Sequence, residues 1–126
     1  MRILLDSHVV LWWLDDNDSL GSRCRDLIQQ ADEAFVSAVT PWELGIKQAL
    51  GKLSMPDGLS DVLTSEGFMS LPITAAHAEL APSLPPLHRD PFDRMLVAQA
   101  QLETLTLVTA DKALANYDIE PFDARS

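Results

Sequence analysis

Four carboxylates stand where separate segments of the chain begin or end, and their positions are the ones most suited to chemistry. Asp6 follows a short apolar run near the N-terminus, and Asp111 follows a second apolar run near the C-terminus. Glu43 and Asp93 each lie three residues after a residue that can cap a helix. Four such groups in one place would repel one another strongly unless a cation joined them. Carboxylate oxygens suit Mg²⁺ or Mn²⁺ better than Zn²⁺.

This set of donor atoms indicates phosphoryl chemistry. Mg²⁺ keeps several waters and is usually completed by the phosphate of a substrate. A metal-bound water can then supply the nucleophile, and a second metal can stabilise the leaving oxygen. The chain has no Gly-rich phosphate loop, which excludes a P-loop nucleotide triphosphatase. No pairing of His8, His77 and His88 resembles a zinc motif, and His8 and His88 are expected in loop or surface roles.

The hydropathy pattern predicts a scaffold that can bring these distant segments together. Strands are expected at 3–5, 34–39 and 105–109, with shorter candidates at 69–73 and 119–122. Helices are expected at 7–14, 21–31, 41–50, 74–81 and 91–102. This alternation predicts an α/β fold, a three-layer α/β/α sandwich with a central, mostly parallel sheet. Ligand sites in such sheets lie beyond the carboxyl ends of the strands, where Asp6 and Asp111 are expected.

Length and composition indicate one globular domain spanning residues 1–126. The net charge of −10 argues against a protein that binds nucleic acid through a generally basic surface. A nucleic-acid enzyme remains possible, because a metal ion bound by the acids could coordinate the phosphates. The single Cys24 excludes an internal disulfide and suggests a reducing compartment. The longest apolar run has six residues, against roughly 20 for a bilayer span, so a cytoplasmic protein without membrane contact is expected.

Four short motifs follow one another in a distinctive order and carry a family resemblance. They are Leu4-Leu5-Asp6-Ser7-His8 with Trp12-Trp13, Trp42-Glu43 with Ile46-Lys47 and Gly51-Lys52-Leu53, His88-Arg89-Asp90-Pro91-Phe92-Asp93-Arg94 continuing to Ala100, and Thr109-Ala110-Asp111. At these spacings the set resembles the PIN-domain ribonucleases, specifically the VapC-type toxins of bacterial type II toxin–antitoxin systems. The resemblance covers essentially the whole chain.

The resemblance implies a metal site made from these acids. Asp6 would be the metal ligand at the end of the first strand, and Glu43 and Asp93 the ligands carried by helices. Asp111 would be the fourth acid, often a ligand through water. Asp90 belongs to the same motif and is an additional candidate ligand with a less defined role.

The resemblance also implies an activity and a set of partners. Members of the family hydrolyse RNA phosphodiesters with Mg²⁺ or Mn²⁺, and products with 5′-phosphate and 3′-hydroxyl ends are expected. They commonly form homodimers and are silenced by a cognate antitoxin. Because the chain is acidic, we expect an antitoxin with a basic, partly disordered segment that enters among the carboxylates and displaces the metal.

Several polar residues beside the acids are candidates for contact with the RNA substrate. Ser7 and Thr109 resemble hydroxyl residues that buttress the metal site in the family. Five of the nine basic residues lie close in sequence to the expected acids: Lys47, Lys52, Arg89, Arg94 and Lys112. Of these, Arg89, Arg94 and Lys112 flank the motif acids directly and are expected to meet phosphates.

Each acid also has a structural interpretation. Asp6, Asp90 and Asp111 could cap the helices that follow them, and for Asp90 this is the preferred interpretation. Glu43 and Asp93 could satisfy free amides in capping boxes. The alternative function is a degenerate PIN domain that only binds a partner. A phosphatase or dehalogenase is disfavoured, because the second acid expected two residues after the first is missing.

Overall fold

The computed structural model describes all 126 residues and builds them around one five-stranded sheet. The strands are β1 (Arg2–Leu5), β2 (Glu33–Ser37), β3 (Met69–Leu71), β4 (Thr106–Thr109) and β5 (Phe122–Asp123). Their order is β3-β2-β1-β4-β5, and every neighbouring pair is parallel. The chain therefore moves outward from β1 to β3 and then crosses to β4, so the order reverses between β1 and β4. Parallel sheets of this kind form their ligand sites at that reversal.

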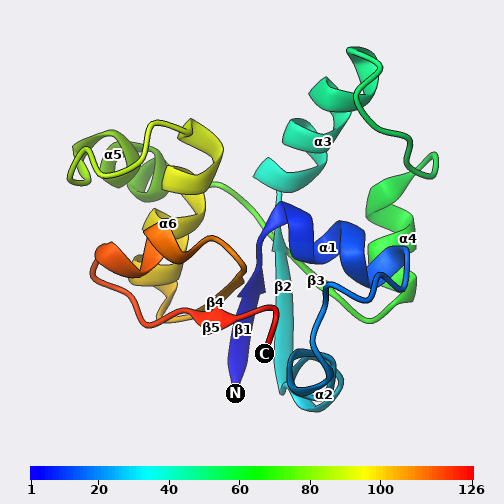
Figure 1. Cartoon of the computed structure of the whole chain (residues 1–126). Helices are drawn as coiled ribbons and strands as arrows, with labels where there is room; N and C mark the ends of the chain where they lie inside the picture. The colour runs from blue at the N-terminus through cyan, green and yellow to red at the C-terminus, as the bar shows by residue number, and fades with distance from the viewer.

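Helices cover both faces of the sheet, which confirms the expected three-layer α/β/α sandwich. The α-helices are α1 (Ser7–Leu14), α2 (Ser22–Gln30), α3 (Val39–Ala49), α4 (Leu59–Ser65), α5 (Ala75–Ser83) and α6 (Pro91–Glu103), and η1 (Lys112–Asn116) is a short 3₁₀ helix. Figure 1 shows α1, α2 and α4 on one side of the sheet and α5 and α6 on the other. None of the helices is long and apolar enough to cross a membrane.

The central strand β1 supplies side chains to the cores on both faces. Ile3 and Leu5 pack with α1, α2 and α4, whereas Leu4 points to the opposite core with α6 and β4. All three side chains are fully buried. A strand that is buried on both faces has apolar residues at every position of its sequence. This explains why β1 can be predicted from three consecutive apolar residues.

The start of α3 differs from the prediction. The helix begins at Val39, because the hydroxyl of Ser37 accepts the N–H of Val39 at 3.0 Å directly after β2 ends. Thr40 therefore lies inside the helix, fully buried, and does not cap it. The last strand is also shorter than predicted, since β5 pairs with β4 only at residues 122 and 123.

Candidate metal centre

Asp6 lies where β1 ends and α1 begins, beside the reversal of the strand order. Its Oδ1 accepts the N–H of Val9 at 2.9 Å and so caps α1. Its Oδ2 accepts the hydroxyl of Thr109, the last residue of β4, at 2.5 Å. Burial raises the pKa of Asp6, although both hydrogen bonds act in the opposite direction. The capping interpretation is thus confirmed, and the same carboxylate joins the ends of the two central strands.

Glu43 reaches the same edge of the sheet from α3 and is almost completely buried. Its Oε1 accepts the hydroxyl of Ser7 at 2.6 Å, and its Oε2 lies 3.1 Å from Nζ of Lys47. The hydroxyl of Ser7 also lies 3.3 Å from that of Thr40. Because α3 begins at Val39, Glu43 is not part of a capping box, and that interpretation is wrong. Its carboxylate faces the residue that follows Asp6.

Asp93 lies in the first turn of α6, and the capping of this helix leaves its carboxylate free. Asp90 is the N-cap: its Oδ1 accepts the N–H groups of Phe92 and Asp93 at 2.8 and 3.4 Å. In a capping box, Asp93 would in return accept the N–H of Asp90. That N–H instead donates to Nδ1 of His88 at 3.1 Å. The capping role of Asp90 is confirmed, and a reciprocal bond from Asp93 is not formed.

The pKa of Asp93 reflects the charges of neighbouring acids. The pKa of Asp93 is raised to about 7, first by burial and then by the negative charge of Asp90, with Asp6 and Glu43 adding to it. Of the neighbouring groups, His88 acts in the opposite direction. The charges of Asp6, at the start of α1, and of Glu43, on α3, therefore act on Asp93 in α6. Hard oxygen donors whose repulsion is only partly offset by Lys47 and His88 fit a divalent cation such as Mg²⁺ or Mn²⁺.

Asp111 joins this site through two of its neighbours. Its N–H donates to Oγ1 of Thr109 at 3.0 Å, and its Oδ1 caps η1 by accepting the N–H of Ala113 at 3.0 Å. Its Oδ2 lies 3.0 Å from Nε2 of His88, which also lies 3.4 Å from Oδ2 of Asp93. One potential ligand atom from each of His88, Asp93 and Asp111 falls within 4.8 Å of the others. Asp111 is 40% exposed, so it forms the open side of the cluster.

His88 is the residue of the site that the sequence prediction missed. A loop or surface role was expected, but His88 is 22% exposed and contacts two of the four acids. The available signal was its position two residues before the N-cap of α6, where a ring nitrogen can accept the N–H of the capping residue.

The prediction that Arg94 binds phosphate is wrong, because its guanidinium is already engaged within the fold. Its guanidinium points to the segment between α5 and α6 and to the ring of Tyr117. There it donates to the hydroxyl of Tyr117 and to the carbonyl oxygens of Ala81, Pro82, Leu84, Pro85 and His88. A rigid guanidinium fork with several donors is well suited to holding carbonyls that no helix satisfies. Arg94 therefore holds the segment that carries His88.

Arg94→Ala is accordingly expected to destabilise the fold by about 3 kcal/mol or more, since hydrogen bonds to a charged group each contribute about 1.5–3 kcal/mol. The free energy of unfolding in urea would measure the loss. Arg89→Ala is the matched control and should leave stability unchanged, because Arg89 is exposed and forms no ion pair. An Arg94→Ala protein as stable as the wild type, but weaker in binding RNA, would restore the phosphate role.

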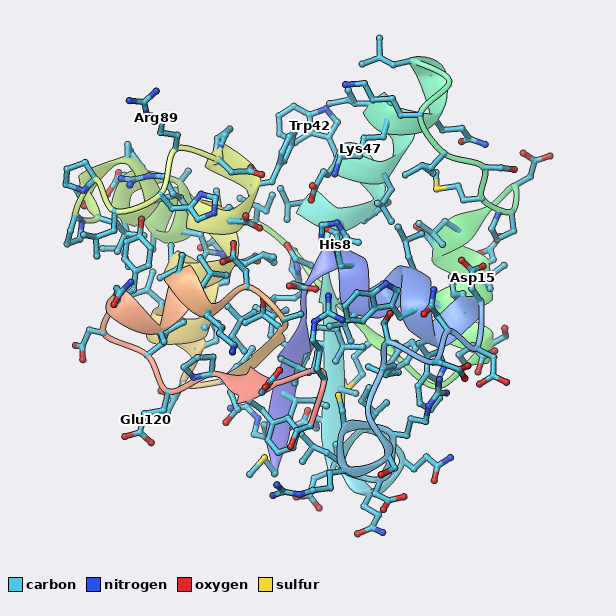
Figure 2. The ribbon with its side chains drawn as sticks, in the orientation of Figure 1. His8, Asp15, Trp42, Lys47, Arg89 and Glu120 are labelled. Atoms are coloured by element: carbon cyan, nitrogen blue, oxygen red, sulfur yellow. The ribbon has the colours of Figure 1, made fainter.

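Arg89 and Lys112 remain exposed near the acids, and neither forms a salt bridge. In Figure 2 the side chain of Arg89 extends away from the ribbon, whereas His8, Trp42 and Lys47 gather near the upper edge of the sheet. Ser7 and Thr109, both expected near the substrate, use their hydroxyls to hold Glu43 and Asp6.

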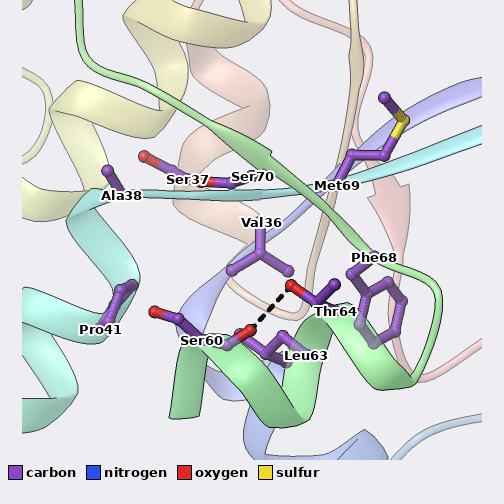
Figure 3. A pocket seen from close by; sticks show the side chains of 10 residues that line it. All are labelled: Val36, Ser37, Ala38, Pro41, Ser60, Leu63, Thr64, Phe68, Met69 and Ser70. Atoms are coloured by element: carbon purple, nitrogen blue, oxygen red, sulfur yellow. Dashed lines mark hydrogen bonds between the residues drawn. The ribbon is translucent and has the colours of Figure 1, made fainter. Parts of the chain in front are cut away.

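Two hollows are lined in part by the start of α3, and one of them includes residues that directly precede acids of the site. The small one in Figure 3 lies among β2, β3 and α4 and contains none of the predicted site residues. The other, of about 410 Å³, lies among α3, α5 and α6 and is mainly apolar. Trp42 and Phe92 line it with their rings 5.1 Å apart, and they immediately precede Glu43 and Asp93. An apolar groove therefore borders the charged site.

Comparisons with known proteins agree with this geometry. The family model described as PIN domain matches residues 3–120. The chain is 34% identical over 122 residues to ribonuclease VapC22 of Mycobacterium tuberculosis, covering 91% of each chain. The fold matches FitAcB from Neisseria gonorrhoeae (TM-score 0.67, 20% identity, 97% of each chain). It also matches VapBC2 from Rickettsia felis, solved with a promoter DNA fragment (TM-score 0.68, 16% identity, 98% of this chain and 100% of that one).

Proposed function

The chain belongs to the PIN-domain family, and from that premise we propose that it is a metal-dependent endoribonuclease acting as the toxin of a toxin–antitoxin pair. The relative with 34% identity over 91% of both chains is named a ribonuclease, which supports RNA as the substrate. The enzyme hydrolyses RNA phosphodiesters inside the strand. PIN-domain ribonucleases of this type depend on metal, and Mg²⁺ or Mn²⁺ is the ion that we propose here.

The observation that carries this proposal is the electrostatic coupling of acids from three separate elements. The pKa of Asp93 is raised to about 7, mainly by burial and by Asp90, and the charges of Asp6 and Glu43 add to this rise. We assign these three acids as the metal ligands, with Asp111 in support. When bound, the metal activates a water and neutralises charge on the phosphate.

The residues around the ligands keep them in place. The hydroxyl of Thr109 fixes one oxygen of Asp6, and the hydroxyl of Ser7 fixes one oxygen of Glu43. Lys47 neutralises the other oxygen of Glu43. Hydrogen bonds to a ligating carboxylate orient it, and their loss typically lowers metal affinity or activity about 10- to 100-fold. We therefore assign Ser7 and Thr109 to orienting the acids.

The proposed activity is tested with the purified chain, free of any partner, on total RNA. We expect cleavage in Mg²⁺ or Mn²⁺, products with 5′-phosphate and 3′-hydroxyl ends, and complete loss of cleavage on addition of EDTA. Mapping the 5′ ends would identify the cleaved sequence. A protein that binds a partner tightly but cuts no RNA under any of these metals would establish the alternative, a binding module.

Arg89 and Lys112 are the exposed cations that we assign to RNA phosphates. Each alanine variant should weaken RNA binding and lower the slope of log affinity against log salt by about 1 or less, since one phosphate contact is lost. Arg23→Ala, on the distant helix α2, is the matched control. Affinity would be measured in EDTA to prevent cleavage. An unchanged salt slope in both variants would remove these residues from the substrate path.

The expected partner is an antitoxin with a basic segment. The net charge of −10 and the buried carboxylates offer a site for Arg or Lys side chains, which would compete with the metal. A solved structure with the same fold, at 18% identity, is described as a toxin–antitoxin complex from Klebsiella pneumoniae. We also propose a homodimer, to be tested by mass in solution. A cytoplasmic location fits the free, buried Cys24.

A further inference from the structure

We propose that His88 is a positioning residue of the metal centre. Its Nε2–H donates to Asp111 and lies beside Asp93, and the ring keeps the two acids in the orientation that binds the ion. The inference rests on the proposed function, because it assumes that these acids serve a metal. Asp93 comes from α6 and Asp111 from the turn before η1. His88 contacts both, at 3.4 and 3.0 Å, and is the side chain that joins them.

The hydrogen bonds of His88 determine which of its ring nitrogens carries the proton. Nδ1 accepts the backbone N–H of Asp90 at 3.1 Å, so Nδ1 must offer a lone pair. A neutral imidazole has one N–H, which must then lie on Nε2. Nε2 is therefore a donor toward Asp93 and Asp111 and has no lone pair for a metal. This argues that His88 orients ligands and is not a ligand itself.

The same bond releases Asp93 for metal binding. The N–H of Asp90 is the group that the third helical residue would bind in a capping box. Because His88 accepts this N–H, Asp93 is not needed for capping. Its Oδ2 lies 3.4 Å from Nε2 of His88, whose N–H donates to Asp111, and its Oδ1 accepts no hydrogen bond and can face an ion.

Arg94 fixes His88 from the other side. Its Nη1 donates to the backbone carbonyl of His88 at 3.3 Å, and the guanidinium also holds the carbonyls just before this segment. His88 is therefore held by hydrogen bonds at three points: its backbone carbonyl, Nδ1 and Nε2. Groups that orient ligating side chains in this way typically contribute about 10- to 100-fold in metal affinity.

The test compares three variants of His88 in the full chain. Alanine removes both ring nitrogens. The amide nitrogen of His88→Gln can take the place of Nε2, and the amide oxygen of His88→Asn can take the place of Nδ1. Mn²⁺ affinity would be measured by calorimetry at one fixed pH of about 8. His8→Ala, an exposed histidine that forms no hydrogen bond to an acid, is the control. Unfolding in urea without metal reports any general effect on the fold.

We expect His88→Ala to weaken Mn²⁺ binding about tenfold or more. His88→Gln should recover most of the affinity, and His88→Asn should recover stability but not affinity. If wild type and His88→Ala bound Mn²⁺ equally well, or if His88→Asn restored Mn²⁺ affinity as fully as His88→Gln, this inference would be overturned and the proposed function would stand. A directly coordinated nitrogen in the electron spin echo spectrum of the Mn²⁺ protein would also overturn it. A wild-type chain that binds no Mn²⁺ would overturn the proposed function and this inference together.

Discussion

Asp6→Asn is expected to lower RNA cleavage about a thousand-fold or more while the protein stays folded. The substitution removes the charge of the carboxylate that lies between the ends of β1 and β4. Each 1.36 kcal/mol of lost transition-state stabilisation lowers the rate about tenfold, and a metal supplies several kcal/mol. Cleavage of a defined RNA in saturating Mg²⁺, compared with the wild type at the same enzyme concentration, measures the effect.

The fold should tolerate this change because asparagine can keep both hydrogen bonds. Its amide oxygen can accept the N–H of Val9, and its amide nitrogen can donate to Oγ1 of Thr109. Asparagine is as good an N-cap as aspartate. Asp26→Asn, an exposed change on α2, is the matched control. Cleavage by Asp6→Asn at the wild-type rate would remove Asp6 from the centre and leave the assignment of the site without its main ligand.

The sheet and the place of the acids at its edge follow from the sequence because they depend on continuous apolar runs. The run of Ile3, Leu4 and Leu5 can be satisfied only in a strand buried on both faces, and such a strand places Asp6 at a carboxyl end. The capping residue before Asp93 predicted the start of α6 at Pro91 correctly, whereas α3 begins two residues before the predicted start, and neither pattern predicted what the carboxylates of Glu43 and Asp93 do.

The contacts of single side chains could not be predicted, since they depend on where a segment turns in space. Whether Glu43 caps a helix or faces Asp6 was decided by the two extra residues at the start of α3. Arg94 and His88 lie in one motif with the acids, and the sequence predicted a phosphate contact for Arg94 and a loop or surface role for His88. In the structure one holds backbone carbonyls and the other holds two acids.

Without metal, the protein is expected to lose stability as the pH rises from about 4 to about 7. The pKa of Asp93 is raised from 3.8 to about 7, so between these values the folded state keeps a proton that the unfolded state has released. Stability falls with pH wherever the folded state binds more protons. Full ionisation of Asp93 corresponds to about 4 kcal/mol as an upper limit. The raised pKa of Asp6 acts in the same direction.

Mn²⁺ or Mg²⁺ should reverse this loss, because a cation stabilises the ionised carboxylates and so offsets the burial and the repulsion that raise the pKa of Asp93. Urea midpoints with and without Mn²⁺ should therefore differ much more at about pH 8 than at about pH 5. Asp93→Asn should be more stable than the metal-free wild type at the higher pH and should gain little from Mn²⁺. A metal-free wild type whose stability is flat over this range would show that neither burial nor neighbouring charge raises the pKa of Asp93 in the folded protein. The electrostatic basis of the proposed metal centre would then be absent.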